Sequence, residues 1–147
     1  MMTVSEIMIT DVNQLPPDAS LEQARSLMAE KSIRHIPIVD AEDHLIGLVT
    51  QRDILAATLS LPSMTEAVDM SGALLTTSDI MRTNVFKIEE NTDLRLAALT
   101  MQRHKIGSLL IVNGERLVGI ITDSDYVGLA INLLEQMEQV EPPELDN

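Results

Sequence analysis

The chain has 147 residues, of which 10 are Lys or Arg and 23 are Asp or Glu, so its formal net charge at pH 7 is −13. Hydrophobic residues make up 45% of the chain, enough for a buried core, which excludes a chain that is disordered throughout. So acidic a chain lacks the basic surface that binds duplex DNA, and Phe86 and Tyr126 are too few aromatic residues to stack successive bases. We therefore expect no nucleic-acid partner.

The absence of cysteine excludes disulfides, thiolate catalysis and cysteine zinc sites, and agrees with a reducing compartment. No apolar run approaches the roughly 18–20 residues that cross a bilayer, and residues 1–6 lack the pattern of a signal peptide. We therefore expect a soluble, cytoplasmic protein that does not associate with membranes.

The chain contains an internal repeat. A shift of 73 positions aligns the two halves from residue 7 onward, and the shift becomes 72 after one deletion. The pairs after the deletion are Gly47 with Gly119, Thr50 with Thr122 and Asp53 with Asp125. The deletion falls between two predicted strands, where a hairpin loop can absorb it.

Each repeat predicts the same elements in the same order. An opening strand-like segment, at 7–15 and 80–88, precedes a helix with an apolar stripe. In the first repeat, Ser20 and Gln23 form a capping-box pattern at the start of that helix. Two short apolar strands and a second helix follow, expected at 36–39, 45–49 and 52–61 in the first repeat and at 109–112, 117–121 and 124–140 in the second.

Local signals support the hairpins and the boundaries. Asn113-Gly114 lies between the last two strands and favours a tight hairpin, because both residues tolerate positive φ. The strands lack polar alternation, so we expect both faces of each sheet to be covered. Pro62 ends one helix, and the pattern from Ser63 to Glu66 predicts a short helix in the connector.

A sheet of three short strands with two helices on one face leaves its other face open. Packing the two open faces together gives one pseudo-twofold α/β (α+β) module of two β-α-β-β-α units. We expect the units at 4–60 and 77–135, a linker at 61–76 and an acidic tail at 136–147.

The repeated Gly-x-x-Thr-x-x-Asp segments, 47–53 and 119–125, place a hydroxyl at a strand end and a carboxylate in the first helical turn. The free N–H groups of that turn and the threonine hydroxyl could hold a phosphate, and the aspartate could accept hydrogen bonds from a ribose. The alternative is a helix cap without a ligand, which by itself stabilises by about 0.5–2 kcal/mol. Aspartate is shorter than the Glu or Gln usual in a reciprocal cap, which favours the ligand interpretation. The two roles are compatible.

At these residues the chain resembles the tandem CBS-domain pair, or Bateman module. The resemblance rests on Ile7-Met8 and Ile80-Met81, the segment 32–40, and both Gly-x-x-Thr-x-x-Asp segments, and it covers about 4–60 and 77–135. It implies two clefts between the units, binding of AMP, ADP, ATP or S-adenosylmethionine, and a regulatory role. It also implies a homodimer formed through helices.

The resemblance implies the ligand-binding positions residue by residue. Those at the phosphate or ribose are Thr50, Asp53, Thr122 and Asp125. Those beside the adenine and in the cleft wall are Thr10, Val12, Ile33, Arg34, His35, Pro37, Thr83, Val85, Ile106 and Ser108. The two clefts are unequal, because Arg34, His35 and Arg52 correspond to Gly107, Ser108 and Ser124 in the second repeat. Phosphate should favour the cleft that receives Arg34 and Arg52.

The leading hypothesis is a non-enzymatic sensor that binds an adenine nucleotide and signals its occupancy to a protein partner, with Mg²⁺ accompanying ATP. No cofactor is required, and the three scattered histidines predict no metal site. A different hypothesis is an interaction scaffold with empty clefts. An enzyme is not expected, because no base–nucleophile pair, Walker loop or Gly-x-Ser-x-Gly motif is present.

Overall fold

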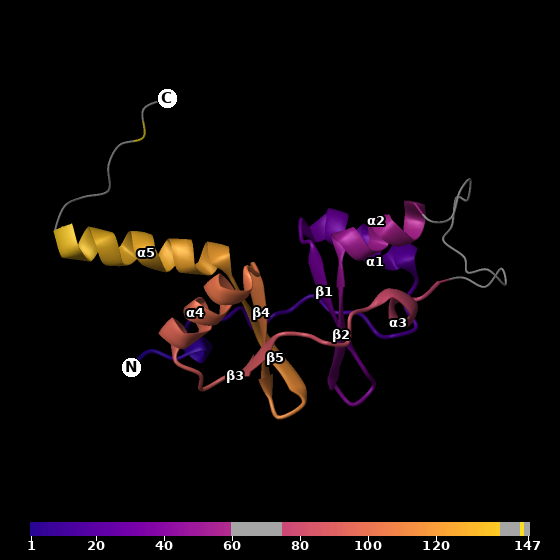
Figure 1. Ribbon diagram of the computed structural model, residues 1–147, viewed down its shortest axis with the longest axis horizontal. Coiled ribbons are helices and arrows are strands. Elements are labelled where there is room, and N and C mark those ends of the chain that lie inside the picture. Colours follow the sequence, from indigo (N-terminus) through magenta and orange to yellow (C-terminus); the bar gives the residue numbers. More distant parts are fainter. Residues whose placement is uncertain (60–74, 139–144, 146–147) are drawn as a thin grey trace.

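The computed structural model describes residues 1–59, 75–138 and 145. The first repeat contains α1 (Leu21–Lys31), β1 (His35–Val39), β2 (Leu45–Thr50) and α2 (Gln51–Leu59). The second contains β3 (Lys87–Glu89), α4 (Leu94–His104), β4 (Ser108–Asn113), β5 (Arg116–Thr122) and α5 (Asp123–Glu138). Each repeat begins with a short helix, η1 (Val4–Glu6) in the first and α3 (Thr77–Ile80) in the second. The two sets of elements lie at opposite ends of the molecule (Figure 1).

The two hairpin strands of each repeat and the second helix of each repeat are confirmed to within one or two residues wherever the structure describes them, whereas the opening segments predicted at 7–15 and 80–88 are strand only at β3. The helix predicted within 63–66 lies outside the described residues, as do most of the linker and of the acidic tail. Gly114, at the predicted hairpin, has a φ of +66°. Among the described helices, none is both long and apolar enough to cross a bilayer.

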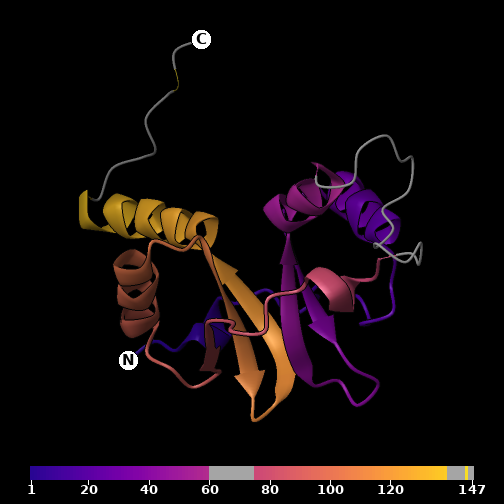
Figure 2. The ribbon, with the colours of Figure 1, turned by 45° about the vertical axis from the view of Figure 1, so that its right-hand side comes forward.

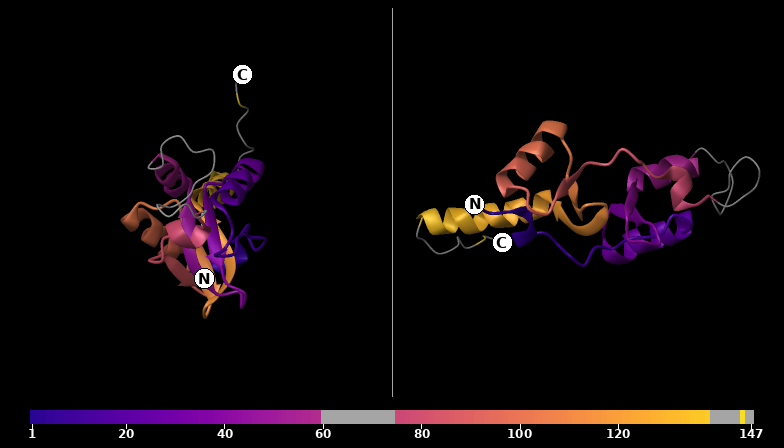
Figure 3. Two further views of the ribbon diagram at one scale, coloured as in Figure 1. Left: turned by 90° about the vertical axis from the view of Figure 1, so that its right-hand side faces the viewer. Right: turned by 90° about the horizontal axis from the view of Figure 1, so that it is seen from below.

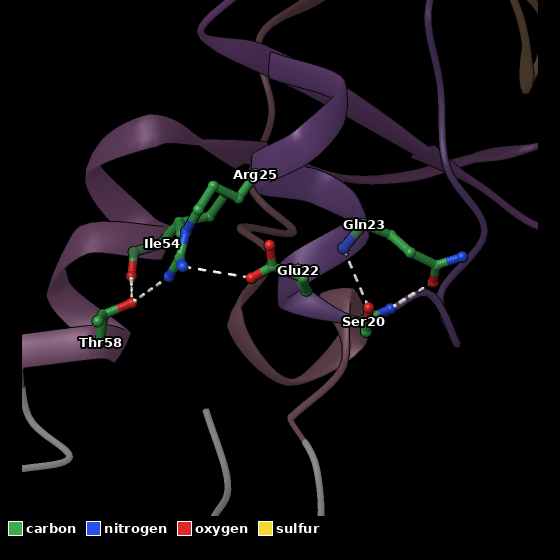
Figure 4. Close-up of polar contacts among 6 residues, drawn as sticks. All are labelled: Ser20, Glu22, Gln23, Arg25, Ile54 and Thr58. Atoms are coloured by element: carbon green, nitrogen blue, oxygen red, sulfur yellow. Dashed lines mark hydrogen bonds and ion pairs between the residues drawn. The ribbon is translucent and has the colours of Figure 1, made fainter. Parts of the chain in front are cut away.

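The capping box predicted at the start of α1 is present (Figure 4). Ser20 Oγ accepts a hydrogen bond from the Gln23 N–H at 3.0 Å, and Gln23 Oε1 accepts one from the Ser20 N–H at 2.8 Å. Farther along α1, Arg25 donates to Thr58 Oγ1 at 3.1 Å and so connects α1 with α2. These contacts fix the helical layer of the first repeat.

The opening segments behave differently in the two repeats. In the second, β3 pairs in parallel with β4, which pairs in antiparallel fashion with β5. In the first, β1 and β2 form a two-stranded sheet, and the expected strand reduces to a single parallel bridge between Leu15 and Ile38. Pro16 and Pro17 follow Leu15, and because proline has no N–H they cannot extend the ladder.

The start of each opening segment crosses to the opposite repeat. Ile9 exchanges two backbone hydrogen bonds with Ile120 of β5, of 2.9 and 3.0 Å, and Arg82 exchanges two with Leu48 of β2, of 2.8 and 2.9 Å. The preceding helices cross as well, since Val4 N–H donates to the Thr92 carbonyl at 2.9 Å. Seen from below, the N-terminal segment lies at the end that carries α5, and α3 lies at the end that carries α1 and α2 (Figure 3).

The hydrophobic core shows the same crossing, because side chains of each opening segment pack in the core of the opposite repeat. Val4, Ile7 and Met8 of the first repeat pack in the core of the second, and Ile80 and Met81 pack in the core of the first. A third cluster joins the two sheets, which stand side by side in Figure 2. It comprises Leu45 and Leu48 from the first repeat and Val85, Leu110, Val112, Leu117 and Ile120 from the second. The predicted sheet-to-sheet packing is therefore confirmed, with the opening segments interlocked.

Two matched glycines permit this crossing. A Cβ on Gly47 would lie 2.8 Å from Met81 Cγ and 3.1 Å from the Arg82 carbonyl oxygen. A Cβ on Gly119 would lie 2.9 Å from Met8 Cγ and 3.1 Å from the Ile9 carbonyl oxygen. The glycine of each repeated motif therefore allows close approach of the other repeat's backbone.

We predict that Gly47→Ala destabilises the fold by about 1–3 kcal/mol, because the methyl group overpacks a backbone contact between the repeats. Gly128→Ala is the matched control, since a Cβ there meets no atom within 4 Å. Gly128 lies inside α5, so the control should stabilise by up to about 1 kcal/mol through helix propensity. Urea unfolding of both variants measures the difference, and equal stabilities would contradict the close approach.

Candidate functional site

A pocket of about 500 Å³ opens where the two repeats meet, a volume in the range of small-molecule sites. The first repeat contributes the residue before β1, parts of β1 and β2, and the start of α2: Arg34, His35, Leu48, Thr50, Gln51 and Arg52. The second contributes its opening segment and the residues before and within β4: Arg82, Asn84, Val85, Phe86, Lys105, Ile106, Gly107, Ser108 and Leu110. A single cleft therefore draws on both repeats.

At the pocket edge, strand β2 is followed by helix α2 with no intervening loop. Because α2 begins at Gln51, directly after β2, the threonine at the strand end lies beside the first helical turn. The Gln51 N–H donates to the Arg34 carbonyl at 2.9 Å, and the equivalent Asp123 N–H donates to the Gly107 carbonyl at 3.0 Å. Lys105 caps α4 with a φ of +55°. The start of α2 brings Arg52 to the cleft, and the end of α4 brings Lys105.

The Thr50–Asp53 motif forms a reciprocal cap. Asp53 Oδ2 accepts a hydrogen bond from the Thr50 N–H at 2.9 Å, and Thr50 Oγ1 accepts one from the Asp53 N–H at 3.2 Å. Aspartate is shorter than the Glu or Gln usual in such a cap, yet its carboxylate reaches the Thr50 N–H and closes the cap. The cap is therefore real, and Thr50 nevertheless lines the pocket.

Arg82 connects this cap to the opposite repeat. Its Nε lies 3.1 Å from Asp53 Oδ1 and 3.3 Å from Oδ2, and its Nη2 lies 3.1 Å from Oδ1. The Asp53 side chain is 13% exposed and that of Arg82 is 60% exposed. Burial raises the pKa of Asp53, but hydrogen bonds from Arg82 and Thr50 outweigh it and hold this pKa below 3.8.

The pocket is strongly cationic for so acidic a chain. Four of the ten Lys and Arg residues line it: Arg34, Arg52, Arg82 and Lys105. His35 adds little positive charge at pH 7, because burial and then the charge of Arg34 lower its pKa below 6.5. The charge of the pocket therefore comes from fixed guanidinium and ammonium groups that suit an anionic ligand.

The structure places the expected binding residues in two groups. Seven line the pocket: Arg34, His35, Thr50, Arg52, Val85, Ile106 and Ser108. Asp53 lies behind Arg82, Pro37 is buried within β1, and Ile33 packs against the first-repeat core. The others do not line the pocket: Thr10, Val12 and Thr83 lie in the opening segments, Thr122 ends β5, and Asp125 lies in the first turn of α5.

Apart from Gly107, which was expected in the cleft wall, sequence reasoning missed the remaining lining residues. Arg82, Asn84 and Phe86 flank the expected Thr83 and Val85, and Lys105 precedes Ile106. A charge comparison of the repeats could have singled out Arg82, because its counterpart under the 73-residue shift is the apolar Ile9. Phe86 is 45% exposed and packs against His104, with 4.5 Å between ring centroids.

The second copy of the motif has a different environment. Asp125 Oδ2 accepts hydrogen bonds from the Thr122 N–H at 2.8 Å and from its hydroxyl at 3.1 Å. The crossing residue at that side is Ile9, so the position equivalent to Arg82 supplies no cation to Asp125. The two motifs therefore differ in the residue that the opposite repeat supplies beside them, arginine in the first and isoleucine in the second.

Asp40, Glu42 and His44, in the loop between β1 and β2, have potential metal-ligand atoms within 4.8 Å of one another. Asp40 Oδ1 accepts hydrogen bonds from the N–H groups of Glu42 and His44, each at 2.9 Å. The cluster lies outside the pocket lining, and its carboxylate hydrogen bonds are those of a tight loop.

We predict that the pKa of Asp53, followed by NMR titration, lies below 3.8 and rises in Arg82→Met, because the variant removes the guanidinium hydrogen bonds. Asp53 therefore stabilises the fold above pH 3.8, and this contribution is lost as the pH falls through the folded-state pKa. Asp40 is the control, because its lowered pKa arises first from the His44 N–H and should not change. An unchanged Asp53 pKa in the variant would contradict the ion pair.

Comparisons with known proteins agree with this architecture. A crystal structure of a candidate acetoin utilization protein (AcuB) from Vibrio cholerae is 41% identical, with a TM-score of 0.80, over 97% of this chain and 99% of that one. The CBS domain pair of protein MJ0100, solved in complex with 5'-methylthioadenosine and S-adenosyl-L-methionine, is 25% identical, with a TM-score of 0.72. The match covers 88% of this chain and 96% of that one. CBSX2 in complex with AMP has a TM-score of 0.78 at 23% identity, over 91% and 99%.

The chain spans 42% of the length of two curated relatives that are 32% and 30% identical, and 93% of a third that is 32% identical. The family model of the CBS domain matches residues 4–60 and again residues 78–131. The chain therefore belongs to the CBS-domain family, as a tandem pair of CBS domains.

Proposed function

We propose that this chain is a non-enzymatic sensor that binds an adenine nucleotide in the pocket between the repeats. The observation that carries the proposal is the gathering of Arg34, Arg52, Arg82 and Lys105 around one pocket of about 500 Å³. Guanidinium and ammonium groups suit the phosphates of a nucleotide. The solved CBS pairs bound to AMP and to adenosine derivatives support adenine as the base.

The rest of the pocket suits a nucleoside. Its apolar side chains, Leu48, Val85, Phe86, Ile106 and Leu110, offer a wall for a purine. Thr50, Ser108 and Asn84 add hydroxyl and amide groups that can orient a ligand. The cations disfavour S-adenosylmethionine, whose sulfonium is positive, relative to AMP, ADP or ATP.

Signalling follows from the position of the pocket. A ligand that touches both repeats favours one relative packing over another, but only to the extent that its affinity for the two arrangements differs. A protein partner that senses this packing would respond to occupancy. Mg²⁺ would accompany ATP by reducing the charge of its phosphates.

We predict that AMP raises the melting temperature of the chain in a saturable way and that S-adenosylmethionine does so less.

Arg52→Ala should weaken AMP binding by about tenfold or more in titration calorimetry, because one charged hydrogen bond to phosphate is lost. Adenosine, which lacks phosphate, should bind the wild type and this variant equally. If no adenine ligand stabilises the wild type, the interaction scaffold becomes the better interpretation.

We further propose that the chain forms a homodimer through α4 and α5. None of the 16 residues of α5, all of them described, is buried. Apolar side chains on the two helices are exposed by 43% to 78%: Leu96, Leu99, Val127, Ile131, Leu133, Leu134 and Met137. So large an apolar surface is typical of an interface.

We predict that the wild type elutes with the mass of two chains in size-exclusion chromatography with light scattering. Ile131→Lys combined with Leu134→Lys should give the mass of one chain, because two charges would be buried at the interface. Ser26→Lys, on the exposed face of α1, is the control and should remain dimeric. A wild type with the mass of one chain would contradict the proposal.

A further inference from the structure

One cation of the pocket has a second role, because Arg82 lines the pocket while its guanidinium is occupied by Asp53. The contact joins the opening segment of the second repeat to α2 of the first. Asp53 does not line the pocket. The carboxylate of the repeated motif therefore lies behind the arginine that a phosphate would attract.

The two carboxylate oxygens of Asp53 are held differently. Oδ2 belongs mainly to the helix cap, since it accepts the Thr50 N–H at 2.9 Å and has a longer contact of 3.3 Å with Arg82 Nε. Among the described residues, Oδ1 has Arg82 as its hydrogen-bond partner, through Nε at 3.1 Å and Nη2 at 3.1 Å. Removing the guanidinium would therefore free Oδ1 and leave the cap in place.

We propose that Arg82 is a latch that a phosphate-bearing ligand releases. The ligand phosphate replaces Asp53 as the partner of the guanidinium, and the freed Oδ1 accepts a hydrogen bond from a ribose hydroxyl. The inference rests on the nucleotide site proposed above and adds a specificity-determining residue to it. No bond is made or broken; the guanidinium exchanges one oxyanion for another.

The exposed fractions of Arg82 and Asp53, the charge of the ligand and the difference between the two motifs support this exchange of partners. Arg82 is 60% exposed, so its side chain can turn without disturbing the core, whereas Asp53 is 13% exposed and fixed by its cap. A nucleoside without phosphate has no anionic group that could replace Asp53 as the partner of Arg82. The ion pair between Arg82 and Asp53 therefore disfavours binding of the nucleoside. In the second motif, Ile9 occupies the position of Arg82, so Asp125 has no equivalent latch.

The exchange also links binding to the contact between repeats. While the latch is closed, Arg82 holds α2 of the first repeat to the opening segment of the second through an ion pair. When it opens, the ligand itself joins these elements, with phosphate on Arg82 and ribose on Asp53. Phosphate-bearing and phosphate-free adenine ligands would therefore differ in their effect on the contact between α2 and the opening segment of the second repeat.

The test compares AMP and adenosine by titration calorimetry on the wild type, Arg82→Met and Arg52→Met. Methionine keeps the length of the side chain but cannot pair with a carboxylate. In Arg82→Met, AMP affinity should fall by about tenfold or more through loss of a charged hydrogen bond. Adenosine affinity should rise by about two- to fivefold, because Asp53 is no longer occupied.

Arg52→Met is the matched control. Arg52 lines the same pocket, but within the described residues Asp53 receives its side-chain ion pair from Arg82 and not from Arg52. This variant should lose AMP affinity without gaining adenosine affinity. Asp53→Asn completes a double-mutant cycle. Adding Arg82→Met to Asp53→Asn should not increase the affinity for adenosine.

The outcomes separate the latch from the nucleotide site. If the wild type binds AMP but adenosine affinity is unchanged in Arg82→Met, or rises equally in Arg52→Met, the latch is wrong and the nucleotide site stands. If neither ligand binds any of the proteins, the proposed function fails and the latch fails with it. Melting temperatures of the unliganded variants verify that each protein is folded.

Discussion

The antiparallel backbone contacts between each opening segment and the opposite repeat determine the rest of this structure. Ile9 with Ile120 and Arg82 with Leu48 form two matched pairs that interlock the repeats. They carry Met8 and Met81 against the glycines of the opposite strands and place Val85 and Phe86 beside the first repeat. Without the crossing, the pocket would lose one of its walls.

Much of the fold could be predicted from the sequence because its signals are local or repeated. Apolar runs marked the hairpin strands, Ser20 and Gln23 marked the start of α1, and Asn113-Gly114 marked a turn. The crossing of the opening segments is not a local property, and neither Ile9 nor Arg82 carries a signal for its partner 30 or more residues away. The missing first strand was predictable in principle, from the two prolines that follow Leu15.

The candidate site was predicted where the repeated motif or the resemblance to CBS domains assigned a position. Thr50 and Arg34 lie in the segments that carry the resemblance and line the pocket. Arg82 and Lys105 lie outside those segments and are brought to the pocket by the crossing and by the end of α4. Thr-x-x-Asp could not decide between cap and ligand site, because the structure makes it a cap that borders a pocket. Spacing alone does not distinguish an aspartate that faces a cleft from one that lies behind an arginine.

The distribution of charge is compatible with the proposed binding of a small anion by an acidic chain. At physiological salt the Debye length is about 8 Å, so the net charge of −13 acts mainly on polyanions that must cover a wide surface. A mononucleotide that enters the pocket meets Arg34, Arg52, Arg82 and Lys105 at much shorter range, with His35 largely uncharged at neutral pH. For the proposed nucleotide, these nearby cations would outweigh the overall negative charge of the chain.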